Sequence, residues 1–477
     1  MSPRLSETTL RAAACRTPSY DRSAVGIGIV HLGLGAFSRA HLASHVDDLL
    51  SLGRRDLGII GVSLRSSGVA EALGPQDGLY VRAIVEDDRI DTRIIGAIRG
   101  VLATSTGSAR IRTALTAPTT RLVTVTVTEK GYCLDASTGR LDTTHPDVLH
   151  DLASPDDPIS LPGWIALAAR LRRDEHGQGF TVASLDNLPA NGRSLQRAVL
   201  DLAGESGSDL AAWVGEHVHF PCSMVDRMVP ATDETLRARV RGLTGVDDAL
   251  PVKTEPYSQW VLERSESAEF ASFADVGVTF VDDVRPWERT KLQVLNALHT
   301  TAALIGLRHG LETIAEVMHD DPGRTLILRV ADELAGVVDP PTGLDLVAYV
   351  ETTLHRFENR ALHHRCAQIA TDSSQKLPQR LLPPLSLRLE RGLPVNALGE
   401  VLALWAWSTL GRDHRGSDRT VRDPLAETYR HIALHHATNP AGLLRALLGL
   451  RQVFGTLADD ERLFAVVEPH LTRLMTH

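Results

Sequence analysis

Short apolar runs alternate with helical patterns over the first half of the chain. Residues 26–32, 57–63, 121–128 and 180–184 are rich in β-branched and other apolar side chains, which is typical of buried strands. Residues 38–52 carry apolar side chains at helical spacing between the first two runs. Strands that alternate with helices predict an α/β domain with a mostly parallel sheet.

The pattern changes after about residue 285. Helical periodicity then follows at residues 325–338, 344–359, 396–411, 441–454 and 460–475, and strand signals are almost absent. We therefore predict an N-terminal α/β domain over residues 1–285 and a mostly α-helical C-terminal domain over residues 286–477.

A group of polar side chains marks the start of the helical part, where Pro286 favours a helix start. At about 100° per residue, Asn296 lies about 140° around a helix from Lys291, while His299 lies at about 80° and Glu288 at about 60°. The other positions of this helix are mainly apolar. An amine, a carboxylate, an amide and an imidazole on one arc suit a small-molecule site, although a solvated polar face would have the same pattern.

Composition and charge exclude several classes of function. Hydrophobic residues make up 43% of the 477 residues and charged residues 23%, which is ordinary for a globular protein. The net charge of −9 argues against a nucleic-acid partner, and no apolar run approaches the length of a membrane span. The four cysteines form no CxxC pair, so we expect a cytoplasmic protein without disulfides or a structural zinc. Nothing in the sequence decides the oligomeric state.

A glycine turn follows the first predicted strand. The order of strand, Gly33-x-Gly35 and helix is the start of a dinucleotide-binding unit, in which glycines let the backbone approach a pyrophosphate. Ala36 and Phe37 follow, so the third glycine of the full fingerprint is missing. A tight turn without a ligand would look the same.

The second predicted strand ends at Ser63 and is followed by Arg65, with no acidic residue to hold a ribose hydroxyl. An arginine flanked by serines could accept a 2′-phosphate and favours NADP, but it could equally be a solvated loop residue. The expected cofactor is therefore NAD or NADP.

Seven blocks in this order resemble the mannitol dehydrogenase family, the long-chain polyol-specific dehydrogenases and reductases that include the hexuronate reductases. They are IVHLGLGAFSRAH (29–41), TVTEKGY (126–132), SLDNLPANG (184–192), FPCSMVDR (220–227), EPYSQW (255–260), KLQVLNALH (291–299) and DSSQKLP (372–378). Together they are highly specific, whereas each alone would be weak.

The resemblance implies a Rossmann-like dinucleotide-binding domain, a helical substrate-binding domain, and metal-independent hydride transfer between a nicotinamide and a secondary alcohol. It implies that Lys291 is the general acid and base and that Asn187 and Asn296 hold the alkoxide oxygen. It also implies that His299 binds a substrate hydroxyl and that Glu288 lies in the proton path.

Further residues are expected to contact the ligands. Thr128 and Glu129 of the second block are expected to lie beside the cofactor. Asp226 and Lys376 match family positions near the substrate. If the substrate carries a carboxylate, it needs an arginine, because a guanidinium pairs with a carboxylate through two hydrogen bonds. Arg365 and Arg380 are the candidates, since both lie near Lys376 in the sequence.

Several alternatives stay open at this point. The substrate is a polyol or a sugar acid, as in the mannitol–fructose or the mannonate–fructuronate pair. A free lysine is mostly protonated at neutral pH, so Lys291 needs desolvation to act as a base. A lysine Schiff-base lyase and a non-catalytic nucleotide-binding regulator are the competing classes of function.

Overall fold

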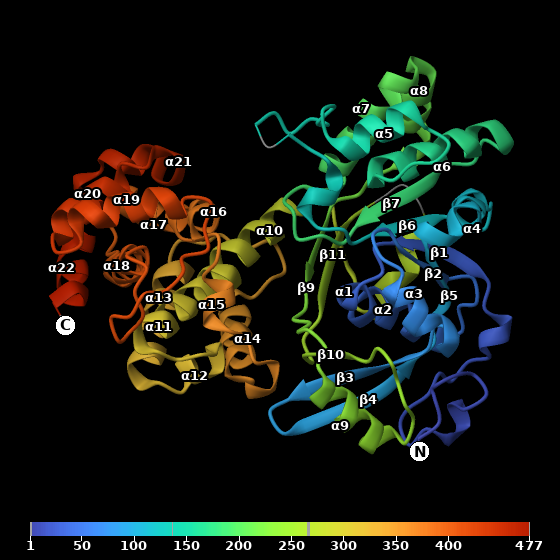
Figure 1. Ribbon diagram of the computed structural model, residues 1–477, viewed down its shortest axis with the longest axis horizontal. Helices are drawn as coiled ribbons and strands as arrows, with labels where there is room; N and C mark the ends of the chain where they lie inside the picture. Colours follow the sequence, from blue (N-terminus) through green and yellow to red (C-terminus); the bar gives the residue numbers. More distant parts are fainter. Residues whose placement is uncertain (1, 136, 265–267, 477) are drawn as a thin grey trace. The chain divides into compact units, whose positions relative to one another are not determined.

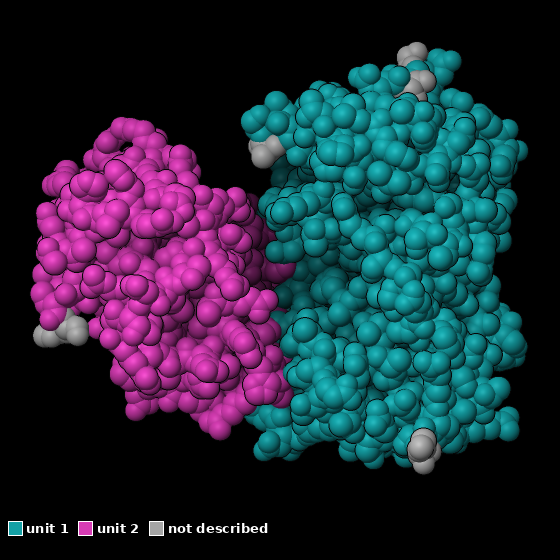
Figure 2. Space-filling model, in the orientation of Figure 1, with its two compact units in different colours: residues 1–285 teal, residues 286–477 magenta. Residues whose placement is uncertain are grey.

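The computed structural model describes residues 2–135, 137–264 and 268–476. The chain divides into two compact units, residues 1–285 and residues 286–477, coloured separately in Figure 2. The dinucleotide-binding role assigned to the first unit and the substrate-binding role assigned to the second stay predictions.

A six-stranded parallel sheet forms the centre of the first unit (Figure 1). Its order is β5-β2-β1-β6-β7-β8, in which the chain moves outward on one side of β1 and then returns to continue on the other. This is the strand order of dinucleotide-binding α/β folds. The strands are β1 (Ile27–Leu32), β2 (Gly58–Ser63), β5 (Ile98–Ala103), β6 (Leu122–Val125), β7 (Phe180–Ser184) and β8 (Val218–His219).

Both faces of this sheet are buried, which explains the apolar runs in the sequence. Val30 and Val123 belong to one hydrophobic core, and their neighbours Ile29 and Leu122 belong to another. The first core contains side chains of α4 (Thr104–Thr116), α6 (Leu161–Glu175), α7 (Asn191–Ser206) and α8 (Ser208–His217), and the second those of α1 (Ala36–Ala40) and α2 (Leu42–Ser51). Helices thus cover both faces, and the predicted Rossmann-like fold is confirmed.

Two predicted elements of this unit differ from the structure. The run at 121–128 forms a strand only over Leu122–Val125, because the backbone of Val127 and Thr128 bonds instead to a side chain described below. The predicted helix at 38–52 is two helices that meet at His41, where φ and ψ are −105° and −80°.

Two smaller sheets complete the first unit, and the sequence patterns did not predict them. One has the order β10-β3-β4 and the other β12-β11-β9. Their strands are β3 (Tyr80–Glu86), β4 (Arg89–Ile95), β9 (Ser223–Asp226), β10 (Val252–Thr254), β11 (Gln259–Glu263) and β12 (Thr279–Val281). The remaining α-helices are α3 (Gly68–Leu73), α5 (Pro146–Ala153) and α9 (Glu234–Thr244).

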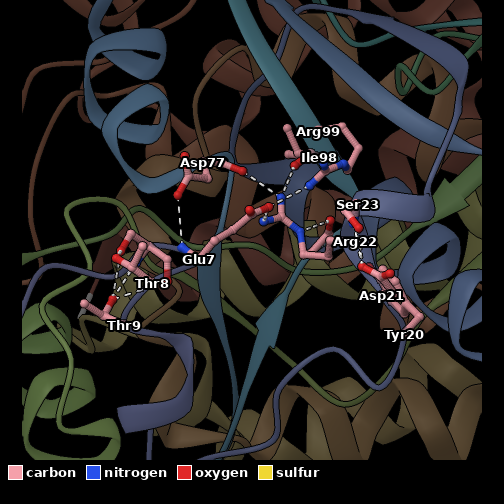
Figure 3. A network of polar contacts seen from close by, with 12 residues as sticks. Glu7, Thr8, Thr9, Tyr20, Asp21, Arg22, Ser23, Asp77, Ile98 and Arg99 are labelled. Carbon is pink, nitrogen blue, oxygen red and sulfur yellow. Dashed lines mark hydrogen bonds and ion pairs between the residues drawn. The ribbon is translucent and has the colours of Figure 1, made fainter.

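A buried arginine ties the N-terminal segment to the edge of the large sheet (Figure 3). Arg22 is only 5% exposed and donates hydrogen bonds to the carbonyl oxygens of Gly96, Asp77 and Ile98 at 3.0, 2.6 and 2.9 Å. It also pairs with Glu7 at 2.6 Å. Its loss would leave buried carbonyl groups without a donor.

The second unit is built from helices, as predicted, but the predicted helix at 441–454 is two helices, Pro440–Leu448 and Arg451–Phe454. Its described residues form α10 (Arg285–Lys291), α11 (Ala297–His309), α12 (Ile314–Met318), α13 (Asp321–Ala335), α14 (Leu346–Glu358), α15 (Cys366–Ile369), α16 (Ser373–Arg380), α17 (Leu382–Glu390), α18 (Asn396–Ser408), α19 (Ala426–His436), α20 (Pro440–Leu448), α21 (Arg451–Phe454) and α22 (Glu461–Thr476). The buried helix α11 packs against α12, α13, α15 and α18. Among the described residues, no helix is both long and apolar enough to span a membrane.

Candidate active site

A cavity of about 320 Å³ lies at the carboxyl ends of three neighbouring strands of the large sheet, β2, β1 and β6. The strand order reverses between β1 and β6, which is where α/β sheets bind their ligands. Three predicted cofactor residues, Gly33, Arg65 and Thr128, line this cavity. The lining is Gly33, Leu34, Ser63, Leu64, Arg65, Ser66, Val69, Thr126, Val127, Thr128, Gly131, Asp147, Ile159, Ser160 and Leu161.

The glycine turn has two glycines with different physical roles. Gly33 has a φ of 94°, and a Cβ at this position would lie 2.0 Å from the carbonyl oxygen of Thr126. At Gly35, the N-cap of α1, the nearest atom to an added Cβ is 3.8 Å away. The fold itself therefore requires Gly33, whereas the space at Gly35 lets a ligand approach the backbone. Ala36 and Phe37 continue into the first turn of α1.

A buried histidine holds this turn against the neighbouring strand. The ring of His31 contacts Thr124 Oγ1 at 2.9 Å and Thr126 Oγ1 at 3.0 Å, and it also contacts the carbonyl oxygen of Gly33 at 3.3 Å. Burial lowers the pKa of His31 to about 4, so the ring is neutral at physiological pH. Its role is structural.

A carboxylate that the sequence analysis missed shapes the loop after β6. Asp186 accepts hydrogen bonds from the backbone of Val127 and Thr128, each at 3.0 Å, and from the hydroxyl of Tyr132 at 3.0 Å. Burial raises the pKa of Asp186. Thr128 is held at a φ of 71°, a strained conformation for a β-branched residue that is often found at functional sites. Glu129 follows, exposed, in a short 3-10 helix.

The loop after β7 carries the predicted Asn187, which is exposed. Asn191 is fully buried and anchors this loop, because its Nδ2 donates to the carbonyl oxygens of Asp186 and Ser223 at 3.0 and 2.9 Å. The sequence predicted only a turn at Asn191. The sequence block 184–192, which also contains Asn187, was the signal that could have indicated the anchoring role of Asn191. Asp226 is buried at the end of β9, where it pairs in register with Gln259.

Four predicted residues of the second unit lie on one stretch of helix that runs from α10 through Leu292–Asn296 into α11. The turn that joins these helices, Leu292–Asn296, is a π-helix rather than the regular α-helix that the sequence analysis assumed. Backbone bonds in a π-helix join residues five apart, so Lys291 and Asn296 lie on one side and the predicted separation of about 140° is wrong. Lys291 is 7% exposed and Asn296 is 8% exposed, while Glu288 is half-buried one turn before Lys291.

Two polar atoms of this group are buried without a hydrogen-bond partner among the described residues, namely Asn296 Nδ2 and His299 Nε2. The imidazole of His299 stacks on Phe357, with ring centroids 5.0 Å apart, and lies 5.4 Å from the ring of His364. Burial and the neighbouring cations lower the pKa of His299 well below its usual value, so the ring is neutral. Unsatisfied buried polar atoms are costly, and a polar ligand would satisfy both.

Several cationic side chains surround this group. Burial is the largest cause of the lowered pKa of His299. The charges of four neighbouring side chains lower this pKa further, namely those of His364, Arg380, Arg356 and Lys376. Arg380 donates to the hydroxyl of Thr300 at 3.0 Å, and burial lowers its pKa to about 10, so it remains charged.

Two other predicted substrate residues, Lys376 and Arg365, also belong to this unit. Lys376 donates to the carbonyl oxygens of Ile369 and Thr371 at 2.9 and 2.5 Å, which leaves one of its three ammonium hydrogens for a ligand. Arg365 is exposed and its backbone pairs with that of Thr313. Its role in binding a carboxylate stays a prediction.

One group of possible metal ligands occurs among the described residues. The ligand atoms of Cys133, His145 and Asp147 all lie within 4.8 Å of one another. Burial raises the pKa of Cys133 to about 11, the backbone N–H of Asp147 donates to His145 Nδ1 at 3.2 Å, and Arg65 pairs with Asp147 at 3.5 Å. A proton and a guanidinium thus compete with any metal ion for these ligands.

Comparison with known proteins gives matches over nearly the whole chain. The mannitol dehydrogenase Rossmann domain matches residues 27–272, and the mannitol dehydrogenase C-terminal domain matches residues 283–475. The D-mannonate oxidoreductase of Escherichia coli K12 is 40% identical over 449 residues, which cover 93% of this chain and 91% of that protein. The mannitol 2-dehydrogenase of Cereibacter sphaeroides is 34% identical and covers 94% of both chains.

A solved structure is also similar. The mannitol 2-dehydrogenase of Pseudomonas fluorescens, in a ternary complex with NAD and D-mannitol, has a TM-score of 0.83 and 32% identity over 99% of both chains. The family resemblance that the seven sequence blocks predicted is confirmed by these matches.

Proposed function

The chain belongs to the mannitol dehydrogenase family, and from that premise we propose that it interconverts the ketone and the secondary alcohol of a hexuronate, as in the fructuronate–mannonate pair. Membership confirms the predicted class of enzyme, a nicotinamide-dependent dehydrogenase that acts on a CH–OH group.

The main support for the proposed substrate is a pair of buried atoms without a hydrogen-bond partner among the described residues, Asn296 Nδ2 and His299 Nε2. Charged arginines lie near His299. The amide and the imidazole suit hydroxyl and carbonyl groups. A sugar carboxylate suits a buried guanidinium such as that of Arg380, because its planar donors match both carboxylate oxygens. The greater identity to a D-mannonate oxidoreductase than to a mannitol 2-dehydrogenase supports the same choice.

The residues that the family resemblance named have the following roles in the proposed reaction. When bound, NAD would accept the hydride and NADH would supply it, and the open space beside Gly35 would let the pyrophosphate approach the backbone. During oxidation, Lys291 Nζ takes the hydroxyl proton while the C–H electron pair leaves as hydride, and during reduction it returns the proton.

The other predicted side chains support this step. The amides of Asn187 and Asn296 donate hydrogen bonds to the oxygen that bears the developing charge, and His299 binds an adjacent hydroxyl. Glu288 relays the proton between Lys291 and solvent. A lysine base and amide donors suffice for this chemistry, so we propose that it needs no metal.

The decisive experiment measures the loss of NADH absorbance with fructuronate, tagaturonate and fructose for the wild type and for Lys291→Met. We expect turnover of a uronate and a loss of at least about 100-fold in kcat for Lys291→Met. Lys253→Met is the matched control, because Lys253 is as buried as Lys291 but lies in the small sheet of β10.

Other outcomes would contradict parts of the proposal. Turnover of fructose but not of a uronate would contradict the sugar-acid substrate and favour a hexitol. Full activity of Lys291→Met would contradict its role as acid and base. Covalent trapping of substrate on Lys291 by borohydride would replace hydride transfer by Schiff-base chemistry.

A further inference from the structure

One carboxylate, that of Asp147, lines the cavity at the ends of β2, β1 and β6. Asp147 lines the cavity together with Arg65, although the two residues are 82 positions apart in the sequence. Their side chains pair at 3.5 Å, with Arg65 74% exposed and Asp147 23% exposed. The segment that follows β2, from Ser63 to Ser67, contains no acidic residue of its own.

The pair lies at the place where the fold selects its nucleotide. In a dinucleotide-binding unit, the end of the second strand meets the adenosine ribose, and an acid there binds the 2′-hydroxyl while an arginine accommodates a 2′-phosphate. Arg65 lies two positions after the last residue of β2, Ser63. The same cavity is lined by the apolar side chains of Leu64, Val69, Ile159 and Leu161, which suit an adenine ring.

Asp147 is much less exposed than Arg65. It lies in the first turn of α5, where the helix dipole favours a charged carboxylate. Its backbone N–H donates to the ring of the N-cap residue His145 at 3.2 Å, so the start of the helix does not depend on the Asp147 side chain. Arg65, in contrast, is largely exposed, and an exposed ion pair is weak enough for a ligand to displace.

We propose that Asp147 replaces the acid that is missing after β2 and makes this enzyme prefer NAD(H) to NADP(H). The carboxylate accepts a hydrogen bond from the ribose 2′-hydroxyl of NAD. A 2′-phosphate would instead face the negative charge of Asp147 and would have to compete with it for Arg65. The inference rests on the proposed function, and it reverses the preference for NADP that Arg65 alone suggested.

The test measures the dissociation constants of NADH and NADPH by fluorescence titration without a sugar substrate. For the wild type, we expect NADH to bind at least about tenfold more tightly than NADPH. In Asp147→Asn, removal of the like charge should tighten NADPH binding by at least about tenfold and weaken NADH binding a few-fold. Asp157→Asn, an exposed acid outside the cavity lining, is the matched control and should keep the wild-type ratio.

Two further variants separate the charge effect from a folding effect. Asp147→Ser should give the same change in the NADH-to-NADPH ratio, because it also removes the charge. Adding Arg65→Gln to Asp147→Asn should abolish the gain in NADPH binding, because the phosphate then loses its partner.

The possible failures of the two proposals are distinguishable. A wild-type preference for NADPH, or an unchanged ratio in both Asp147 variants, would overturn this inference while leaving the proposed reaction intact. If the wild type bound neither nucleotide, the proposed function would fail, and this inference would fail with it.

Discussion

Replacement of Gly33 by alanine tests whether the cofactor turn is as tightly constrained as the structure indicates. The new Cβ would lie 2.0 Å from the carbonyl oxygen of Thr126, whereas ordinary contact begins at 3.4 Å, so the two strand ends must separate by about 1.4 Å. The left-handed φ of 94° adds about 1–2 kcal/mol for a residue with a side chain.

The separation also strains hydrogen bonds that hold the turn. Thr126 Oγ1 donates to the carbonyl oxygen of Gly33 at 2.7 Å, and the backbone N–H of Thr126 donates to the carbonyl oxygen of Leu32 at 3.0 Å. Loss of either bond costs about 1 kcal/mol. We therefore expect Gly33→Ala to lower the free energy of unfolding of the first unit by roughly 3–4 kcal/mol and to weaken NADH binding.

Gly35→Ala is the matched comparison, because its φ of −117° and its 3.8 Å clearance accept a methyl group. This variant should unfold at or slightly above the wild-type midpoint but bind NADH at least about tenfold more weakly, because the ligand loses its close approach to the backbone. The assays are urea unfolding followed by circular dichroism and fluorescence titration with NADH. Wild-type stability and NADH affinity in Gly33→Ala would refute this account of the turn.

Three further perturbations follow from the contacts described above. Arg380→Met should raise the KM for a uronate by at least about tenfold, whereas the exposed Arg365→Met should change it less, and steady-state kinetics with both variants measures the difference. Arg22→Ala should lower the free energy of unfolding by about 2–4 kcal/mol, and Arg16→Ala, whose ion pair is exposed, by less than about 0.5 kcal/mol in the same urea titration. Burial holds the pKa of His31 near 4, so as the pH falls below about 6.5 only the unfolded chain binds a proton at this imidazole. The free energy of unfolding should therefore decrease by about 2 kcal/mol between about pH 6.5 and pH 5. Urea titrations of His31→Gln over the same range should show a smaller decrease.

Local patterns in the sequence were sufficient to predict the strands β1, β2, β6 and β7. These strands are buried on both faces, so nearly every side chain is apolar or β-branched and the signal needs no long-range information. The smaller sheets were not predicted, because β4 alternates charged and apolar residues and β9, β10 and β12 have only three or four residues. Their pairing depends on partners that are distant in the sequence.

The candidate site was predictable only in part. The blocks of the chain identified Lys291, Asn296 and His299, but a constant helical angle could not show the π turn that brings Lys291 and Asn296 to one side. Residues distant in the sequence contact this turn, since Arg380 from α16 donates to the carbonyl oxygen of Asn296 at 3.5 Å and to the hydroxyl of Thr300. Asp186 likewise carried no separate signal, because its acceptor role depends on where the loop after β6 leaves the sheet.

The fold class, the family and the glycine turn were all predictable from the order of residues, because burial and backbone geometry restrict which residues occupy each of those positions. Contacts between distant side chains were not predictable in this way. Asp147 faces Arg65 across 82 residues, and their pairing comes from two separate segments that line one cavity. Charge and hydrogen bonding act through space rather than along the chain, so the cofactor preference inferred here could not be read from either segment alone.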